Sequence, residues 1–228
     1  MKHATITFIT GTDTDVGKTV VTASLAAMLA ARGESVAAYK PTQTGVLPGE
    51  PGDMEEVARL SGIDVVRAGV RLQDPMAPVP AAARENAQLP TLQGHVRAIL
   101  ELAQGHDNVL VEGAGGLLVE MDTLGNTIAD LAAAIPAPHR TAVVLVCRSA
   151  LGTLNHTLLT LEALERRSLA AAGLVIGSWP TSPSFIENSN REHFQGLTTP
   201  LLGALPAGAA LLDPADFRRM APKWLPNP

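Results

Sequence analysis

The sequence lacks several features that mark whole classes of protein. Its only cysteine is Cys147, so no disulfide can form within the chain, which fits a reducing compartment. No apolar run reaches about 18 residues, and the N-terminus lacks the charged-then-apolar layout of a secretory signal, so we expect a cytoplasmic protein with no membrane partner. A net charge of −5 without a clustered basic stripe argues against nucleic acid as the main partner.

The composition is that of an ordinary globular chain. Hydrophobic residues make up 46% of the 228 residues, and the mean hydropathy is +0.17. Such a chain can bury a sizeable core, and we expect one domain over residues 1–228. Cys147 ends the apolar run 142–147. A packed strand residue therefore explains this cysteine better than a nucleophile does.

The most informative segment is Gly11-Thr-Asp-Thr-Asp-Val-Gly-Lys-Thr19, which follows an apolar strand and precedes a helix. Backbone N–H groups of such a loop and the helix N-terminus behind it point at an anion, Lys18 adds a positive charge, and the Thr19 hydroxyl can hold Mg²⁺. The segment therefore predicts a site for ATP or another nucleoside triphosphate. The residues expected to bind the nucleotide here are Thr12, Asp13, Thr14, Asp15, Val16, Gly17, Lys18, Thr19 and Val20.

The general phosphate-loop pattern would place a glycine at position 12, where this chain has Thr12 and carries its glycine at Gly11. The flanking segments supply the required order, because residues 5–9 have the pattern of a strand and residues 20–31 that of a buried helix. The alternative is an ordinary turn between a strand and a helix. The lysine and hydroxyl together at the helix start favour the phosphate site.

Strand-like and helix-like segments alternate along the whole chain. Apolar runs expected to form strands lie at residues 5–9, 35–39, 109–111, 142–147, 173–176 and 200–205. Helix-period segments lie at residues 20–31, 54–60, 92–102, 128–134, 154–166 and 184–194, and the proline-rich stretches 75–80 and 180–183 are expected to be loops. This alternation predicts an α/β fold of the P-loop NTPase kind, a mostly parallel sheet with helices on both faces and ligands at the carboxyl ends of the strands.

Charged residues stand where three of these segments begin or end. Lys40 follows the second strand and Thr44 lies just beyond it, Asp53 precedes a helix, and Glu112 ends an apolar strand before Gly-Ala-Gly-Gly. Lys40 also fits a surface lysine at the sheet rim, and Asp53 also fits a helix N-cap. Glu112 fits a Mg²⁺ ligand or a water-holding group in a phosphoryl-transfer site.

Four ordered motifs make the sequence resemble the dethiobiotin synthetase family, over nearly the whole chain. They are Gly11 to Thr19, Tyr39-Lys-Pro41 with Thr44-Gly45, Val111-Glu-Gly-Ala-Gly-Gly116, and Gly152-Thr-Leu-Asn-His156. The displaced glycine of the phosphate loop is the family's own form. Asp13 stands where partitioning and nitrogenase-type ATPases carry a second loop lysine, which disfavours that branch.

The resemblance implies an ATP-dependent ligase of biotin biosynthesis, which joins 7,8-diaminononanoate and CO₂ into the cyclic urea dethiobiotin. A carbamate and a carbamic–phosphoric anhydride would be the intermediates. It implies Mg²⁺ on Thr19, Asp53 and Glu112, and catalytic roles for Lys18, Lys40 and Thr14. It also implies a homodimer in which substrate is bound by Lys40, Thr44, Gly115, Gly152, Thr153 and Asn155.

One position departs from the family. The family often has an asparagine that contacts adenine after the strand at 173–176, and this chain has Gly177 there. We therefore expect base recognition through backbone groups around Gly177, Pro206 and Gly208, with CTP or other triphosphates accepted.

Two rival functions share the phosphate loop. One is the cobyrinic acid a,c-diamide synthase type, which needs a glutaminase domain with a nucleophilic cysteine, and this chain is expected to be too short for one. The other is a regulatory ATPase switch, which would bind nucleotide without needing a diamine.

Overall fold

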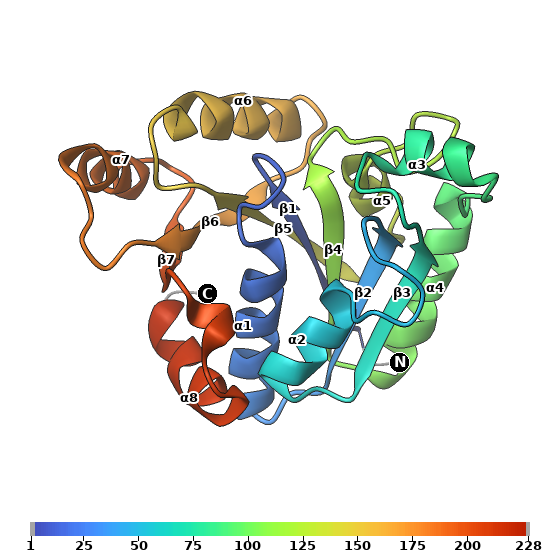
Figure 1. Cartoon of the computed structure of the whole chain (residues 1–228), viewed down its shortest axis with the longest axis horizontal. Helices are drawn as coiled ribbons and strands as arrows, with labels where there is room; N and C mark the ends of the chain where they lie inside the picture. Colours follow the sequence, from blue (N-terminus) through green and yellow to red (C-terminus); the bar gives the residue numbers. More distant parts are fainter. Residues whose placement is uncertain (1–2, 227–228) are drawn as a thin grey trace.

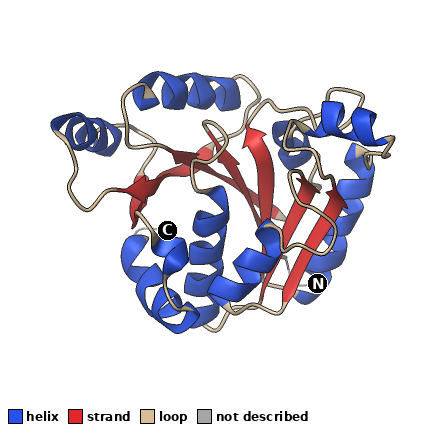
Figure 2. Ribbon diagram, in the orientation of Figure 1, coloured by secondary structure: helices blue, strands red, loops and turns tan. Residues whose placement is uncertain are grey.

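The computed structural model describes residues 3–226, and its centre is a parallel sheet of seven strands (Figures 1 and 2). Along the sheet the order is β3-β2-β4-β1-β5-β6-β7. The strands are β1 (Thr5–Gly11), β2 (Val36–Gln43), β3 (Val65–Arg71), β4 (Asn108–Gly116), β5 (Arg140–Cys147), β6 (Ala171–Trp179) and β7 (Leu201–Pro206). The helices are α1 (Lys18–Ala31), α2 (Asp53–Ser61), α3 (Pro78–Glu85), α4 (Leu92–Gly105), α5 (Ile128–Ala133), α6 (Thr153–Glu165), α7 (Phe185–Gln195) and α8 (Pro214–Trp224), with a 3₁₀ turn η1 (Ala209–Leu211).

Helices cover both faces of the sheet, as the sequence predicted. Helices α1, α2 and α8 pack together on one face, and α4 and α5 cover the other, where Leu164 of α6 joins the same apolar cluster (Figure 1). A further cluster around Leu145, Cys147 and Phe194 lies where α6 and α7 pack. No helix within residues 3–226 is long and apolar enough to cross a bilayer.

Burial on both faces explains why the strands are continuous apolar runs. In β4, Val109 and Val111 pack against α4 and α5, while Leu110 between them packs against the layer of α1, α2 and α8. Successive strand residues point to opposite faces, so a central strand with two covered faces needs apolar residues at every position.

Besides the short 3₁₀ turn η1, the structure contains three elements that the sequence patterns did not indicate, namely β3, α3 and α8. β3 is an edge strand whose residues are all at least partly exposed, and Arg67 and Arg71 interrupt its apolar pattern. The predicted loop 75–80 is wrong in its second half, because α3 begins at Pro78, a first-turn position that needs no N–H donor. β2 and β4 also extend further than expected, into the Lys40 and Glu112 motifs themselves.

Candidate functional site

The loop between β1 and α1 presents its backbone in the form that phosphate binding requires. Gly17 is the N-cap of α1 with φ of 96°, and no side chain caps the helix, so its first N–H groups remain available. A Cβ on Gly11 would lie 2.7 Å from Val16 Cγ2 and 2.8 Å from the Asp13 carbonyl oxygen, which explains the glycine at this position. Lys18 folds back over the loop, and its Nζ donates to the Asp13 carbonyl oxygen at 3.0 Å.

The sheet order brings the second and third motifs to this loop. β1 pairs with β4 on one side, with Ile9 opposite Glu112, and β2 pairs with the other side of β4. The carboxyl ends of β2 and β4 therefore lie at the same edge as the phosphate loop. Asp53 reaches this edge from the first residue of α2, whose N-cap is Gly52 and not Asp53 itself.

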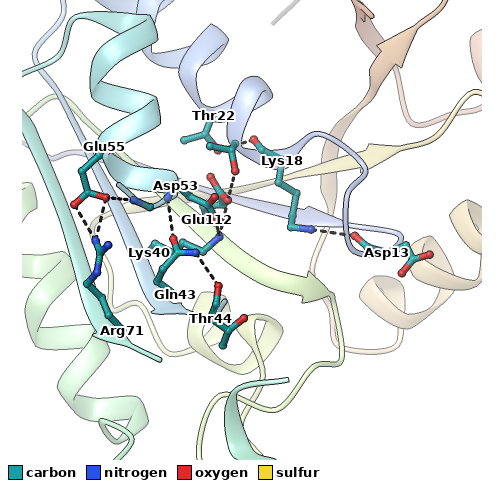
Figure 3. Close-up of polar contacts among 12 residues, drawn as sticks. Asp13, Lys18, Thr22, Lys40, Gln43, Thr44, Asp53, Glu55, Arg71 and Glu112 are labelled. Carbon is teal, nitrogen blue, oxygen red and sulfur yellow. Dashed lines mark hydrogen bonds and ion pairs between the residues drawn. The ribbon is translucent and has the colours of Figure 1, made fainter. Parts of the chain in front are cut away.

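Lys40 contacts both acidic residues of the site, Asp53 and Glu112 (Figure 3). Its Nζ donates to Glu112 Oε1 at 2.7 Å and to Asp53 Oδ2, and the Thr19 hydroxyl donates to the same Glu112 oxygen at 2.9 Å. The Lys40 side chain is 5% exposed and that of Glu112 is fully buried, so this is a buried ion-pair cluster and not a lysine at the sheet rim. Burying these charges is costly unless they are paired or meet a ligand.

Glu112 has an unused ligand atom. Its Oε2 is buried and has no hydrogen-bond partner among the described residues. Thr19, Asp53 and Glu112 supply only oxygen atoms, which is the ligand type that Mg²⁺ prefers, usually with one or two carboxylates and further oxygens from phosphate and water. No cluster of three or more His, Cys, Asp or Glu side chains within residues 3–226 forms a cage for a metal. The residues present therefore fit a Mg²⁺ ion that arrives with a phosphate ligand.

The two lysines have different electrostatic surroundings. Burial lowers the pKa of Lys18 below its usual range, although Glu112 acts in the opposite direction. Burial would also lower the pKa of Lys40, but Glu112 and Asp53 together outweigh it, so the pKa of Lys40 is raised. Lys40 is thus a firmly held cation, whereas Lys18 forms no ion pair with a carboxylate of residues 3–226 and would gain from an anion on the loop.

The sequence analysis missed Gln43, which positions Asp53. The Oε1 of Gln43 accepts the Asp53 N–H at 2.9 Å, and Glu55 Oε2 accepts the neighbouring Gly52 N–H at 2.7 Å (Figure 3). Arg71 of β3 in turn holds Glu55, with its Nη1 2.9 Å from Oε1. The signal available was the polar glutamine between Thr42 and Thr44, at the end of a strand whose residues are all buried.

These residues surround a hollow of about 490 Å³, lined by Thr14, Asp15, Gly17, Lys18, Thr19, Val20, Lys40, Gln43, Thr44, Gly45, Val46, Asp53, Glu112 and Ala114. A second hollow of about 440 Å³ also has Thr14 and Thr44 in its wall and extends to Gly115 and the segment before α3. The two adjoining hollows provide room for a triphosphate and a second small molecule side by side. A larger hollow of about 760 Å³ lies around Glu165 and Pro200, and it contains none of the predicted residues.

A third hollow, of about 250 Å³, lies behind the phosphate loop, and its wall includes Val16, Arg148, Ser178 and Ala207. Gly177 does not line it. A Cβ on Gly177 would lie 1.9 Å from the Val16 carbonyl oxygen, so this glycine supports the back of the loop. Pro206 and Gly208 flank Ala207 in the chain.

Arg148 is another residue that the sequence analysis did not single out. It follows β5, and its Nη2 donates to Asp13 Oδ2 at 2.9 Å and to the Thr14 carbonyl oxygen at 3.0 Å. Its own carbonyl oxygen accepts the Thr153 hydroxyl at 2.7 Å. The segment after β5 therefore connects the phosphate loop to the start of α6.

The start of α6 lies apart from the hollows at the phosphate loop. Gly152, with φ of 91°, is the N-cap, and the buried Thr153 directs its hydroxyl at Arg148 instead of capping the helix. Neither these two residues nor Asn155 lines the hollows that contain Lys18 and Lys40. Leu151 beside them is 82% exposed. Within one chain, Gly152 and Asn155 are also exposed, whereas Thr153 is buried.

Cys147 is a packed strand residue, as predicted. It is fully buried, and burial raises the pKa of its thiol to about 12. A thiol with so little thiolate at neutral pH is a poor nucleophile. The glutaminase-type chemistry of the cobyrinic acid a,c-diamide synthase alternative has no nucleophile here.

The fold has clear relatives among solved structures. Cell division protein FtsY from Thermotoga maritima matches with a TM-score of 0.56 at 16% identity, over 96% of this chain and 69% of that chain. The cell division ATPase MinD of Pyrococcus furiosus matches with a TM-score of 0.56 at 19% identity, over 100% of this chain and 93% of that chain. A family model described as an AAA domain matches residues 6–215. Fold and loop together define a P-loop NTPase-type protein.

Proteins with similar sequences identify the family of this chain more narrowly than the structural relatives do. ATP-dependent dethiobiotin synthetase BioD of Rhodococcus jostii is 48% identical over 220 residues, covering 96% of this chain and 94% of that protein. The protein of the same name from Streptomyces coelicolor is 50% identical over 221 residues, covering 96% and 91%. The chain belongs to the dethiobiotin synthetase family.

Proposed function

We propose that this chain is a ligase that makes dethiobiotin from 7,8-diaminononanoate, CO₂ and ATP or another nucleoside triphosphate, in biotin biosynthesis. The observation that carries the proposal is the convergence of buried Lys18, Lys40 and Glu112 with Asp53 on one hollow beside the phosphate loop. The motifs that contain Lys40 and Glu112 thus lie beside the phosphate loop, where the γ-phosphate of a bound triphosphate would lie. We place this single-domain enzyme in the cytoplasm, where its nucleotide substrate is available.

The reaction needs two anions to approach one another. One amine of the diamine captures CO₂ and loses a proton to give a carbamate. A carbamate oxygen then attacks the γ-phosphorus and displaces the nucleoside diphosphate. The second amine attacks the carbonyl carbon of the mixed anhydride and expels phosphate, which closes the cyclic urea.

The lysines counter the repulsion between these anions. Lys18, at the start of α1, is placed to balance charge on the γ-phosphate, and Lys40 is placed to balance the carbamate and the transferring phosphoryl group. Thr14 and Thr44 line both adjoining hollows, so their hydroxyls can donate to oxygens of either anion. Gly115 lets the backbone of β4 turn beside the second hollow, because its φ is 70°.

Thr19, Asp53 and Glu112 would hold Mg²⁺. When bound, the ion supplies charge neutralisation at the phosphate oxygens. Gln43 fixes the α2 N-terminus from which Asp53 projects, and the buried position of Glu112 keeps its carboxylate from being solvated by bulk water.

The diamine also carries a carboxylate, which a second copy of the chain would bind. Gly152, Thr153 and Asn155 lie at the start of α6, where Gly152 and Asn155 are exposed, so we propose that this segment serves the site of the partner in a homodimer. The exposed Leu151 beside them supports an apolar contact at this point.

Gly177 has no side chain with which to contact a nucleobase. We propose that the base lies in the third hollow, whose wall includes Ser178 and Ala207, and that it contacts backbone groups there and in the loop of Pro206 and Gly208, while Gly177 supports the phosphate loop. Main-chain contacts distinguish bases weakly. We therefore expect competition calorimetry to give affinities for ATP, CTP, GTP and UTP within about tenfold of one another, and a larger preference for ATP would contradict this.

The function is tested by measuring phosphate release from Mg²⁺ and mixed nucleotides, with and without 7,8-diaminononanoate and bicarbonate, and by detecting dethiobiotin by mass. We expect release that requires both co-substrates and yields the cyclic urea. Glu112→Gln should abolish it, and Lys223→Met in α8 is the matched surface control. Phosphate release that is indifferent to the diamine would favour the regulatory ATPase switch instead.

A further inference from the structure

Lys40 holds the oxygen atoms that a divalent cation would also need. Its ammonium contacts Glu112 Oε1 at 2.7 Å and Asp53 Oδ2, so one cation bridges both carboxylates (Figure 3). The Thr19 hydroxyl donates to the same Glu112 oxygen at 2.9 Å. The three side chains suited to a metal are thus tied to one another and to a lysine.

The two lysines and the two carboxylates around Lys40 balance in charge. Lys18 and Lys40 contribute two positive charges and Asp53 and Glu112 two negative charges, while Asp15, which also lines the hollow, is exposed to solvent. Lys18, Lys40 and Glu112 are at most 7% exposed, so solvent screens them little. A free divalent cation would add two positive charges to this buried group, whereas a metal–triphosphate complex brings its own negative charge.

We propose that Lys40 makes the site selective for the metal–nucleotide complex and against the free divalent cation, because its ammonium competes with a free cation for the two carboxylates. A triphosphate on the loop relieves this competition, since it offers Lys40 another anionic partner and frees carboxylate oxygens for the metal. This role rests on the proposed function but is separate from the charge balancing of the reacting groups.

Lys18 provides the internal contrast. It carries the same charge in the same hollow, yet its Nζ contacts the Asp13 carbonyl oxygen at 3.0 Å and neither carboxylate. If net charge alone excluded a free cation, neutralising either lysine would have a similar effect. If direct competition for the carboxylate oxygens matters, only neutralising Lys40 will have a large one.

The test is binding of Mn²⁺ alone, followed by electron paramagnetic resonance of the free ion, on the full chain without nucleotide or diamine. We expect Lys40→Met to bind Mn²⁺ about tenfold or more tighter than the wild type. Lys40→Arg, Lys18→Met and the surface control Lys223→Met should bind it about as weakly as the wild type. Adding Glu112→Gln to Lys40→Met should remove the gain.

Adding ADP gives the second readout. ADP should markedly increase the Mn²⁺ affinity of the wild type. The factor by which ADP increases the Mn²⁺ affinity of Lys40→Met should be smaller. Equal Mn²⁺ affinity of the wild type, Lys40→Met and Lys40→Gln, each shown to be folded by circular dichroism, would overturn the proposal. An equal gain for Lys18→Met would overturn it too, in favour of net charge alone. No turnover enters these measurements, so their outcome is independent of whether dethiobiotin is formed.

Discussion

Acid should destabilise the protein through one buried histidine. His95 of α4 is 1% exposed, its Nδ1 lies 2.7 Å from the Tyr39 hydroxyl oxygen, and its Nε2 has no partner among the described residues. Burial lowers the pKa of His95 from 6.5 to about 4, and Asp122 offsets this only in part. The folded protein therefore keeps this imidazole neutral at pH values where the unfolded chain binds a proton.

The sign and size of the change in the free energy of unfolding with pH follow from this difference between the pKa values of the folded and unfolded states. Between about pH 4 and 6.5 the unfolded state binds more protons, so the free energy of unfolding rises with pH and falls on acidification. At 1.36 kcal/mol for each pH unit, the contribution lost by about pH 4 is about 3 kcal/mol. The stability is fully present above pH 6.5, the value for the unfolded histidine.

Urea unfolding followed by circular dichroism measures this effect. The comparison is with His95→Gln, because its amide oxygen can still accept the Tyr39 hydroxyl but does not titrate. Between about pH 7.5 and pH 4 the wild type should lose about 3 kcal/mol more than the variant, since carboxylates elsewhere contribute equally to both. Parallel curves of unfolding free energy against pH for the two proteins would show that His95 does not cause the loss of stability in acid.

Three further predictions follow from the packing and the site. Burial raises the pKa of the Cys147 thiol to about 12, so native protein at about pH 8 should leave a thiol reagent unreacted while unfolded protein reacts. Equal labelling rates would contradict this. Gly203→Ala should lower the free energy of unfolding by roughly 2 kcal/mol or more, because its Cβ would lie 1.9 Å from the Trp224 carbonyl oxygen. Gly105→Ala, with nothing within 4 Å, is the control, and equal stability of the two variants would show the contact to be absent. Gln43→Leu removes the acceptor of the Asp53 N–H, so the Mg²⁺ concentration for half-maximal turnover should rise several-fold with little change in the KM for nucleotide. An unchanged Mg²⁺ requirement would reduce Gln43 to a packing role.

The central part of the fold could be predicted from the sequence because a strand that is buried on both faces of a sheet consists of a continuous run of apolar residues. The runs at 109–111 and 142–147 are of this kind, and both are central strands. The edge strand β3 has no such run, since Arg67 and Arg71 occupy exposed positions there and pair with Glu101 and Glu55. In α3 and α8 the first-turn prolines Pro78 and Pro214 resemble loop residues, although both fit the start of a helix.

The part of the site that could be predicted consists of charged side chains near the carboxyl ends of strands. Lys40 and Glu112 lie in the carboxyl-terminal halves of the neighbouring strands β2 and β4, so the parallel sheet alone brings them to one edge. Gln43 and Arg148 were not predictable in the same way, because each acts through a contact with a distant segment. The Gln43 side chain meets the start of α2, and that of Arg148 meets the phosphate loop. Such contacts depend on loop paths that residue patterns do not specify.

The strand that carries the phosphate loop is flanked on both sides, by β4 and β5, and lies at the middle of the sheet. Its amide protons should accordingly be among the slowest in the molecule to exchange with heavy water, and those of β3 and β7 among the first. A ligand on the phosphate loop is therefore bound next to β1, the part of the sheet that is expected to unfold last. Binding should therefore raise the melting temperature of the whole chain instead of rigidifying one flap. A thermal-shift screen can then find compounds for this site without any supply of the diamine.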